Sequence, residues 1–374
     1  MTSLETLLGT RDWLMADGAT GTNLFNMGLE AGEAPELWNE VESGKVRALY
    51  EGAASSGSDI FLTNSFGGNA SRLRLHDAAA RVFDLNRIAA EIAREVADAA
   101  GRPVVVAGSM GPTGEIMAPL GPLTSETAAD MFEEQARGLL AGGADVLWVE
   151  TISAPEEFEA ASIGIARTGA PWCGTMSFDT AGRTMMGLTS ADLARLVERL
   201  PCPPLAFGAN CGVGASDLLR TVLGFAEAEP RLPVIAKGNA GIPKFVEGRI
   251  TYDGTPELMA EYAVLARDCG AKIIGGCCGT TPAHLKAMRA ALEAAPRGPR
   301  PDLDTIAAAL GGFSSASDGL TGAPISRERR RRVRTQPPGS QAHGDEPDER
   351  RCRQRERHDL ASIEQFGSHR PIPP

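Results

Sequence analysis

Two adjacent cysteines, Cys277 and Cys278, stand between glycines in residues 275–281. They follow the apolar run 271–274, which is typical of a buried strand. A third cysteine, Cys211, has a similar setting, since it follows an apolar run and precedes a glycine. Thiolates are preferred zinc ligands, and three of them leave the fourth tetrahedral position open. The sequence therefore predicts a zinc site formed by Cys211, Cys277 and Cys278.

Two other interpretations of these cysteines are weaker. Cysteine is often a buried packing residue, and we expect this role for Cys173, Cys202 and Cys269. The close pair between glycines is less easily explained by packing. A catalytic disulfide is disfavoured because adjacent cysteines close only a strained ring.

Zinc held by three thiolates favours one kind of reaction. Such a complex would be electron-rich, so it would be poor at generating hydroxide for hydrolysis. It would suit a substrate thiol as the fourth ligand, because coordination deprotonates a thiol and keeps it available at neutral pH. The chemistry that follows is transfer of an alkyl group to sulfur.

Polar residues that could hold a substrate follow other predicted strands. The glycine-rich turn at residues 17–22 offers backbone N–H groups to a carboxylate or phosphate, with a plain turn as the alternative. Glu150 could receive an amino group, or form a salt bridge to a barrel residue such as Lys237. Three asparagines at strand ends could bind substrate or serve ordinary turns: Asn64, Asn210 and Asn239.

Short apolar runs alternate with amphipathic segments along most of the chain. The runs expected to form strands are residues 13–17, 59–64, 102–108, 145–151, 171–178, 204–210, 233–237 and 271–274. The expected helices are residues 43–56, 71–100 with a break near 76–77, 125–141, 155–167, 190–200, 215–226, 256–269 and 282–294. This alternation predicts a (β/α)8 TIM barrel, whose sites lie at the carboxyl ends of the strands. A doubly wound sheet is the alternative, but no Gly-x-Gly-x-x-Gly follows the first run.

Composition limits the class of protein. The chain has 374 residues, 43% of them hydrophobic, which suits one large α/β domain. Its net charge of −11 argues against a nucleic-acid partner, and the lack of an apolar run of about 18 residues argues against a membrane span. An odd number of cysteines, seven, and an N-terminus unlike a secretory signal predict reduced thiols and a cytoplasmic location.

The C-terminal part differs in composition. Residues 301–313 are expected to form a trailing helix, so that the barrel domain covers residues 1–313. Residues 314–374 are polar and Arg-rich, and they lack the apolar surface that would offset the entropy lost on ordering. We therefore predict a disordered tail. Nucleic-acid binding by its basic run, residues 327–332, is the lesser alternative.

Four stretches together resemble one enzyme family: residues 17–22, 63–66, 208–212 and 275–280. Their sequences are Asp-Gly-Ala-Thr-Gly-Thr, Thr-Asn-Ser-Phe, Gly-Ala-Asn-Cys-Gly and Gly-Gly-Cys-Cys-Gly-Thr, and the two cysteine motifs are highly specific as a pair. From about residue 13 to residue 294, the chain resembles the homocysteine S-methyltransferase family. Residues 33–39 and 177–188 are most similar to bacterial betaine–homocysteine methyltransferases.

The resemblance implies how the acceptor would bind. Zn²⁺ would be held by Cys211, Cys277 and Cys278. The carboxylate of homocysteine would bind at the turn made of Asp17, Gly18, Ala19 and Thr20. Its amino group would lie near Asp17 and Glu150, and the product would be methionine. The resemblance also allows a homo-oligomer.

The resemblance implies the donor less directly. Glycine betaine is the favoured donor, which would leave dimethylglycine. Three aromatic residues could surround its quaternary ammonium: Trp38, Phe66 and Trp148. Animal betaine enzymes have tyrosines where this chain has Gly67 and Thr151. The alternatives are S-methylmethionine, another sulfonium or a corrinoid protein as donor, and, in another class, a non-catalytic zinc- and thiol-binding barrel.

Overall fold

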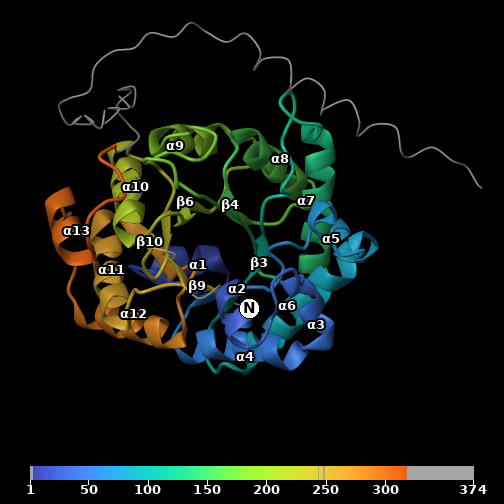
Figure 1. Ribbon diagram of the computed structural model, residues 1–374, viewed down its shortest axis with the longest axis horizontal. Coiled ribbons are helices and arrows are strands. Elements are labelled where there is room, and N and C mark those ends of the chain that lie inside the picture. Colours follow the sequence, from blue (N-terminus) through green and yellow to red (C-terminus); the bar gives the residue numbers. More distant parts are fainter. Residues whose placement is uncertain (1–2, 243, 247–248, 318–374) are drawn as a thin grey trace, which may run out of the picture. The chain divides into compact units, whose positions relative to one another are not determined.

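The computed structural model describes residues 3–242, 244–246 and 249–317 of the chain. Eight parallel strands lie side by side in the order β1, β10, β7, β6, β5, β4, β3, β2, and helices surround them (Figure 1). The strands are β1 (Leu14–Met15), β2 (Ile60–Leu62), β3 (Val105–Met110), β4 (Val146–Ile152), β5 (Trp172–Met176), β6 (Ala206–Cys211), β7 (Val234–Gly238) and β10 (Ala271–Gly276). Each overlaps one of the predicted runs.

Strands β1 and β2, at the two ends of this order, are tied to each other by two aspartates. The N–H of Asp59 donates to Met15 O at 2.7 Å, and the Asp59 carboxylate accepts from Met15 N at 2.9 Å. Further along, Leu62 N donates to Asp17 Oδ2 at 2.7 Å. The eight strands therefore form a nearly closed barrel, which confirms the predicted (β/α)8 architecture.

The main helices match the predicted segments closely. They are α4 (Ser43–Ser55), α6 (Val82–Ala99), α7 (Ser125–Ala141), α8 (Pro155–Ala166), α9 (Ser190–Arg199), α10 (Ala215–Glu227), α11 (Pro256–Cys269) and α12 (Pro282–Ala294). The predicted break in residues 71–100 is confirmed, because α5 (Ala70–Arg74) and η2 (Ala79–Arg81) precede α6. At the break, Asp77 has a φ of 55°, which no α-helix accommodates.

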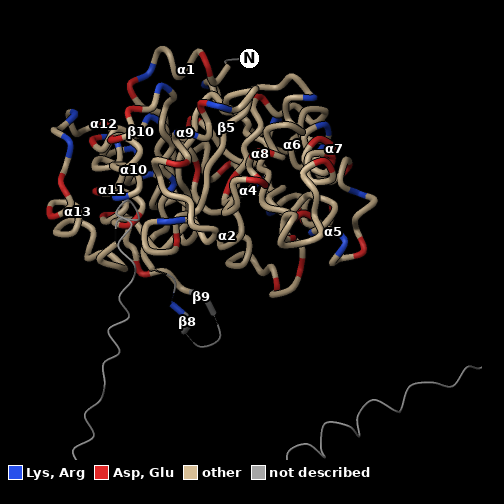
Figure 2. Tube along the Cα trace, turned by 90° about the horizontal axis from the view of Figure 1, so that it is seen from above, with Lys and Arg blue, Asp and Glu red and all other residues tan. Residues whose placement is uncertain are grey.

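Several short elements are not predicted by the sequence, because periodicity needs more residues to show. They are α1 (Leu4–Thr10), α2 (Gly21–Asn26), η1 (Pro35–Leu37), α3 (Trp38–Val41) and the antiparallel hairpin of β8 (Lys244–Val246) and β9 (Arg249–Thr251). Helix α1 and the hairpin lie at opposite ends of the barrel (Figure 2). Since the hairpin follows β7, its end of the barrel is the carboxyl end of the strands, where sites are built.

The apolar core has two layers. Inside the barrel, Leu14, Ile60, Trp148 and Cys173 pack with other strand residues, and Leu4 of α1 joins them. A larger layer fills the space between the strands and the surrounding helices and contains Cys269. Cys173 and Cys269 are therefore packing residues, as predicted, and Trp148 belongs to the core.

The described chain continues beyond α12. Helix α13 (Leu303–Leu310) confirms the predicted trailing helix. Of the tail predicted to be disordered, residues 314–317 are described, and Ser314 and Ser315 are hydrogen-bonded to α10, so the prediction is wrong for these first residues. From residue 318 onward the predicted tail lies outside the described residues, and the domain boundary stays a prediction. Among the described residues, the helices are all too short or too polar to cross a membrane.

Candidate active site

Three thiols meet at the carboxyl end of the barrel. Cys211 is the last residue of β6, and Cys277 and Cys278 directly follow β10. The three Sγ atoms lie within 4.8 Å of one another, and those of Cys211 and Cys278 are 4.0 Å apart. Because β6 and β10 both pair with β7, the fold brings the two cysteine motifs together.

Asn239, just after β7, links the two motifs. Its Nδ2 donates to Gly212 O at 2.8 Å and lies 3.7 Å from Cys211 Sγ. Its Oδ1 accepts from Cys278 N at 3.0 Å. Cys211 has a φ of 63°, and a non-glycine residue keeps such a strained backbone only when its surroundings enforce it. Asn239 supplies part of that enforcement.

Asn210, in β6, supports a second strained residue. Its Oδ1 accepts from Thr151 N at 2.9 Å and from Thr175 Oγ1 at 2.7 Å, and its Nδ2 donates to Thr151 Oγ1 at 2.7 Å. Thr151 has a φ of 63°, which is rare for a β-branched residue. The same Nδ2 lies 3.7 Å from Cys277 Sγ. The amide of Asn210 thus connects the thiol cluster to the end of β4, the strand that carries Glu150.

Replacing Asn210 by alanine should weaken zinc binding by about 10- to 100-fold, the range found for residues that orient metal ligands. The change removes the support of Thr151 and the contact with Cys277. Competition against a chromophoric chelator measures the affinity. Asn210→Asp keeps an acceptor oxygen but loses the N–H donors. Its zinc affinity should therefore lie between those of the parent and Asn210→Ala. Equal affinity in all three proteins would contradict this role.

The donor set fits a zinc ion. All three cysteines are free and partly exposed, and three sulfur atoms converge where zinc prefers sulfur. In the chain by itself, Cys211 raises the pKa of Cys277 most strongly, Cys278 lowers it, and burial raises it again. Cys277 is therefore a neutral thiol at pH 7 without a cation. A metal ion bound there would favour the thiolate, the form in which cysteine is a ligand.

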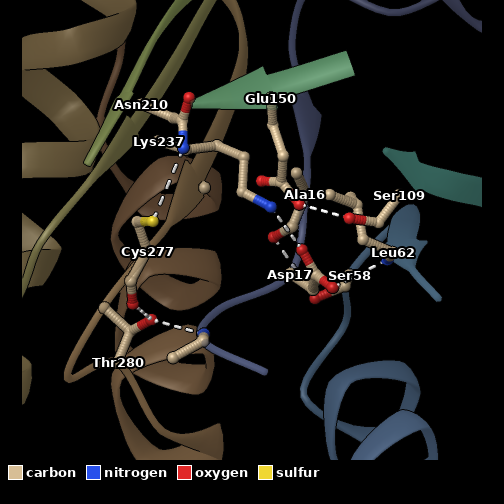
Figure 3. Close-up of polar contacts among 12 residues, drawn as sticks. Ala16, Asp17, Ser58, Leu62, Ser109, Glu150, Asn210, Lys237, Cys277 and Thr280 are labelled. Atoms are coloured by element: carbon tan, nitrogen blue, oxygen red, sulfur yellow. Dashed lines mark hydrogen bonds and ion pairs between the residues drawn. The ribbon is translucent and has the colours of Figure 1, made fainter. Parts of the chain in front are cut away.

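A buried ion pair lies beside the thiols. Lys237 Nζ donates to Asp17 Oδ1 at 2.6 Å, and both side chains are almost inaccessible to water. The other carboxylate oxygen of Asp17 accepts from Leu62 N. Figure 3 shows Lys237 extending toward Asp17 and Glu150. The salt bridge considered for Glu150 from the sequence is thus made to Asp17 instead.

Glu150 is a buried carboxyl group with little direct neutralisation. Its Oε1 accepts from Ser109 Oγ at 2.5 Å. Burial raises the pKa of Glu150, Lys237 and the bond from Ser109 lower it, and Asp17 raises it. A cationic substrate group beside Glu150 would favour the ionised form of this carboxyl group, so the environment suits binding of a cation. The predicted role of receiving an amino group is consistent with this environment.

If homocysteine binds as the sequence resemblance implies, Glu150→Gln should raise its KM about 10-fold or more, since hydrogen bonds to charged groups contribute about 1.5–3 kcal/mol. The variant without substrate should nevertheless be more stable at pH 7. A raised pKa means that the folded chain disfavours ionised Glu150, so stability is lost as pH rises from about 4.3 through the folded pKa. Melting temperatures from pH 4 to pH 8 test this, because the difference should vanish near pH 4.

The exposed Glu156, at the start of α8, provides the matched control. Glu156→Gln should change neither the KM nor the pH dependence of melting. If Glu150→Gln behaved in the same way, Glu150 would not contact the substrate.

The turn after β1 packs against the cysteine turn. Ala19 N donates to Thr280 Oγ1 at 3.0 Å, and Thr280 Oγ1 donates to Cys277 O at 2.6 Å. A Cβ atom at Gly18 would lie 2.6 Å from Thr280 Oγ1, so the close approach requires glycine. Thr20 is the N-cap of α2. The turn expected to hold homocysteine therefore lies next to the thiols. Within it, the N–H of Ala19 already donates to Thr280.

The aromatic residues expected on the donor side differ in accessibility. Trp148 is buried inside the barrel. Trp38 is also buried, and Lys45 Nζ lies over its ring at 4.3 Å from the centroid. Phe66 is partly exposed. Of these three aromatic residues, only Phe66 is thus both partly exposed and outside the barrel core.

Asn64, predicted as a substrate-binding residue, is held within the protein. Its Nδ2 donates to Pro35 O at 2.7 Å and to Asn39 Oδ1 at 2.9 Å. These bonds attach the end of β2 to the segment that carries Trp38. The Asn64 amide therefore anchors this loop.

The sequence does not single out two residues that border the site. Ser109 is the penultimate residue of β3 in a glycine-rich region, and only the fold shows its bond to Glu150. Tyr252 follows β9 in a segment without periodicity. Its ring packs on the cysteine turn, since a Cβ atom at Gly279 would lie 2.4 Å from Tyr252 Cγ.

Comparison with known proteins agrees with this geometry. The family model described as "Homocysteine S-methyltransferase" matches residues 14–292. The methionine synthase of Mycobacterium tuberculosis is 32% identical over 295 residues, which are 75% of this chain and 24% of that protein. The methionine synthase of Mycobacterium leprae is 31% identical over 320 residues, 79% of this chain and 26% of that protein. The chain thus spans about a quarter of the length of these relatives.

Solved structures share the fold. The metallated form of the homocysteine methyltransferase MmuM from Escherichia coli has a TM-score of 0.64 and 24% identity, covering 77% of this chain and 99% of that one. The oxidized form of the same enzyme has a TM-score of 0.64 and 25% identity, covering 78% and 99%. Since the family model covers most of the described residues and both cysteine motifs, this chain belongs to the homocysteine S-methyltransferase family of enzymes.

Proposed function

We propose that the chain transfers a methyl group to the thiol of homocysteine, with Zn²⁺ held by Cys211, Cys277 and Cys278, and so produces methionine. One observation carries this proposal: three thiols lie within 4.8 Å of one another at the carboxyl end of a barrel of this family. Bound zinc would keep the substrate thiol ionised at neutral pH.

The residues of the chain position the acceptor. Glu150 accepts hydrogen bonds from the ammonium group of homocysteine, and the turn at Asp17 lies beside Cys277, to which Thr280 links it. The substrate sulfur then forms a bond to the methyl carbon, while the bond from that carbon to the donor atom breaks and leaves its electron pair on the donor. Alignment of the two substrates supplies much of the rate.

Glycine betaine is the proposed donor. Residues 33–39 and 177–188 support this choice, because they resemble bacterial betaine–homocysteine methyltransferases. Among Trp38, Phe66 and Trp148, Phe66 is the one available to contact a quaternary ammonium. The coproduct would be dimethylglycine.

A second candidate is delivery of the methyl group by a corrinoid-carrying protein. The two mycobacterial methionine synthases favour it, because the matched region is about a quarter of each of them. In that arrangement the barrel would bind homocysteine in the same way, and a different macromolecule would present the methyl group.

An assay with the purified chain separates these donors. The chain is incubated with zinc, homocysteine and one donor at a time: betaine, S-methylmethionine, dimethylsulfoniopropionate or methylcobalamin. Methionine is then measured with and without a chelator. We expect chelator-sensitive methionine formation with betaine. Bound zinc without methionine from any of these donors would contradict the stand-alone reaction with betaine, and would leave delivery by a corrinoid-carrying protein or a non-catalytic zinc-binding barrel.

A further inference from the structure

Residues beyond the family match pack over α10, the helix that follows Cys211. The family model ends at residue 292, but α13 and the residues after it continue along the barrel. Ile306 and Leu310 of α13 are buried in the outer core layer. We call residues 311–315 the strap.

The strap is bonded to the first turns of α10. Ser314 donates to Asp217 twice, from its N at 2.9 Å and from its Oγ at 3.1 Å. Arg220 Nη1 donates to Ser315 O at 2.8 Å, and its guanidinium lies 4.7 Å from the ring centroid of Phe313. Nearby, Ser216 Oγ donates to Gly311 O at 2.7 Å. Side chains of α10 thus contact most of the strap.

These contacts bury charges that a helix on the outside of a barrel would leave in water. Asp217 and Arg220 pair at 2.5 Å, and each residue is only 6% exposed. Buried charges are stable only with partners, and the strap supplies partners to both members of the pair. The first turns of α10 are therefore fixed between the barrel and the strap.

This end of α10 is joined to the thiol cluster by a short segment with positive φ angles, in which Cys211 is the strained residue. Cys211, Gly212 and Gly214 have φ of 63°, 75° and 139°, and α10 begins at the next residue, Ala215. Asn239 holds this segment from the β7 side through Gly212 O. Its other end continues directly into α10, and a strained residue such as Cys211 keeps its backbone conformation only where the surrounding structure fixes it.

We propose that the strap positions Cys211 for metal binding, an inference that rests on the zinc site of the proposed function. Ser314→Pro tests it in the full chain, because proline removes both donors to Asp217 and leaves α10 unchanged. Zinc affinity should fall about 10-fold, as for other residues that orient ligands. The thiolate-to-metal absorption of the Co²⁺-loaded protein should also shift.

Thr124→Ala is the matched control, since it removes the N-cap of the distant α7 and lowers stability without touching the strap. It should lower the melting temperature and leave zinc affinity unchanged. Phe313→Ala is the second strap variant, for use if the proline variant fails to fold, and should also weaken zinc binding. Strap variants that melt earlier but bind zinc like the parent would overturn the strap inference alone. A parent chain that binds no zinc would overturn the proposed function as well.

Discussion

Cys277→Ala is expected to abolish both stoichiometric zinc binding and methionine formation. Cys277 supplies one of three sulfur atoms that lie within 4.8 Å of one another, and two thiols cannot hold zinc as an open three-ligand site. The loss of zinc affinity should exceed the roughly 10- to 100-fold loss that follows when a residue that orients a metal ligand is replaced. Zinc content by elemental analysis and methionine formation with the best donor measure the two effects.

Cys202→Ala is the control for this experiment, because Cys202 is a free cysteine packed at the edge of the outer core and away from the cluster. It should retain one zinc per chain and full activity. If Cys277→Ala also retained one zinc per chain, the ligand assignment would be wrong, whatever its activity.

The barrel and its thiols could be predicted because their signals are local. Residues 125–141 carry an apolar stripe between an N-cap threonine and two glycines, and they form α7 with the predicted bounds. The cysteines were identifiable because each follows an apolar run and neighbours glycine, a pattern that places them at strand ends. A parallel barrel then brings those strand ends to one face.

The polar contacts around the thiols could not be predicted, because they depend on register between distant segments. Asp17 and Lys237 lie 220 positions apart in the sequence, and no local pattern says which of Asp17 and Glu150 the lysine contacts. Likewise, Trp38 is an apparent ligand-binding aromatic in the sequence, but the fold places Lys45 over its ring. Short elements such as the β8–β9 hairpin carry too few residues for a pattern.

Lys237→Met is expected to lower stability and to shift the pH dependence of homocysteine binding. The change leaves Asp17 buried without its partner at 2.6 Å, and breaking a buried pair in this way costs about 3–5 kcal/mol. Lys237 is also the strongest influence that lowers the pKa of Glu150. Its loss raises that pKa further, so less Glu150 is ionised at pH 7 and the KM for homocysteine rises. Raising the pH should restore binding, which KM measurements from pH 6 to pH 9 would show.

The double variant Asp17→Asn/Lys237→Met separates the two effects. The asparagine can still accept from Leu62 N and carries no charge, so most of the lost stability should return. The pKa of Glu150 should lie between those of the parent and the single variant, because Asp17 raises it less than Lys237 lowers it. The pH dependence of KM in the double variant should therefore lie between the other two. A double variant as unstable as Lys237→Met, or a single variant with the parent's pH dependence, would show that Lys237 does not control the charge of this pocket.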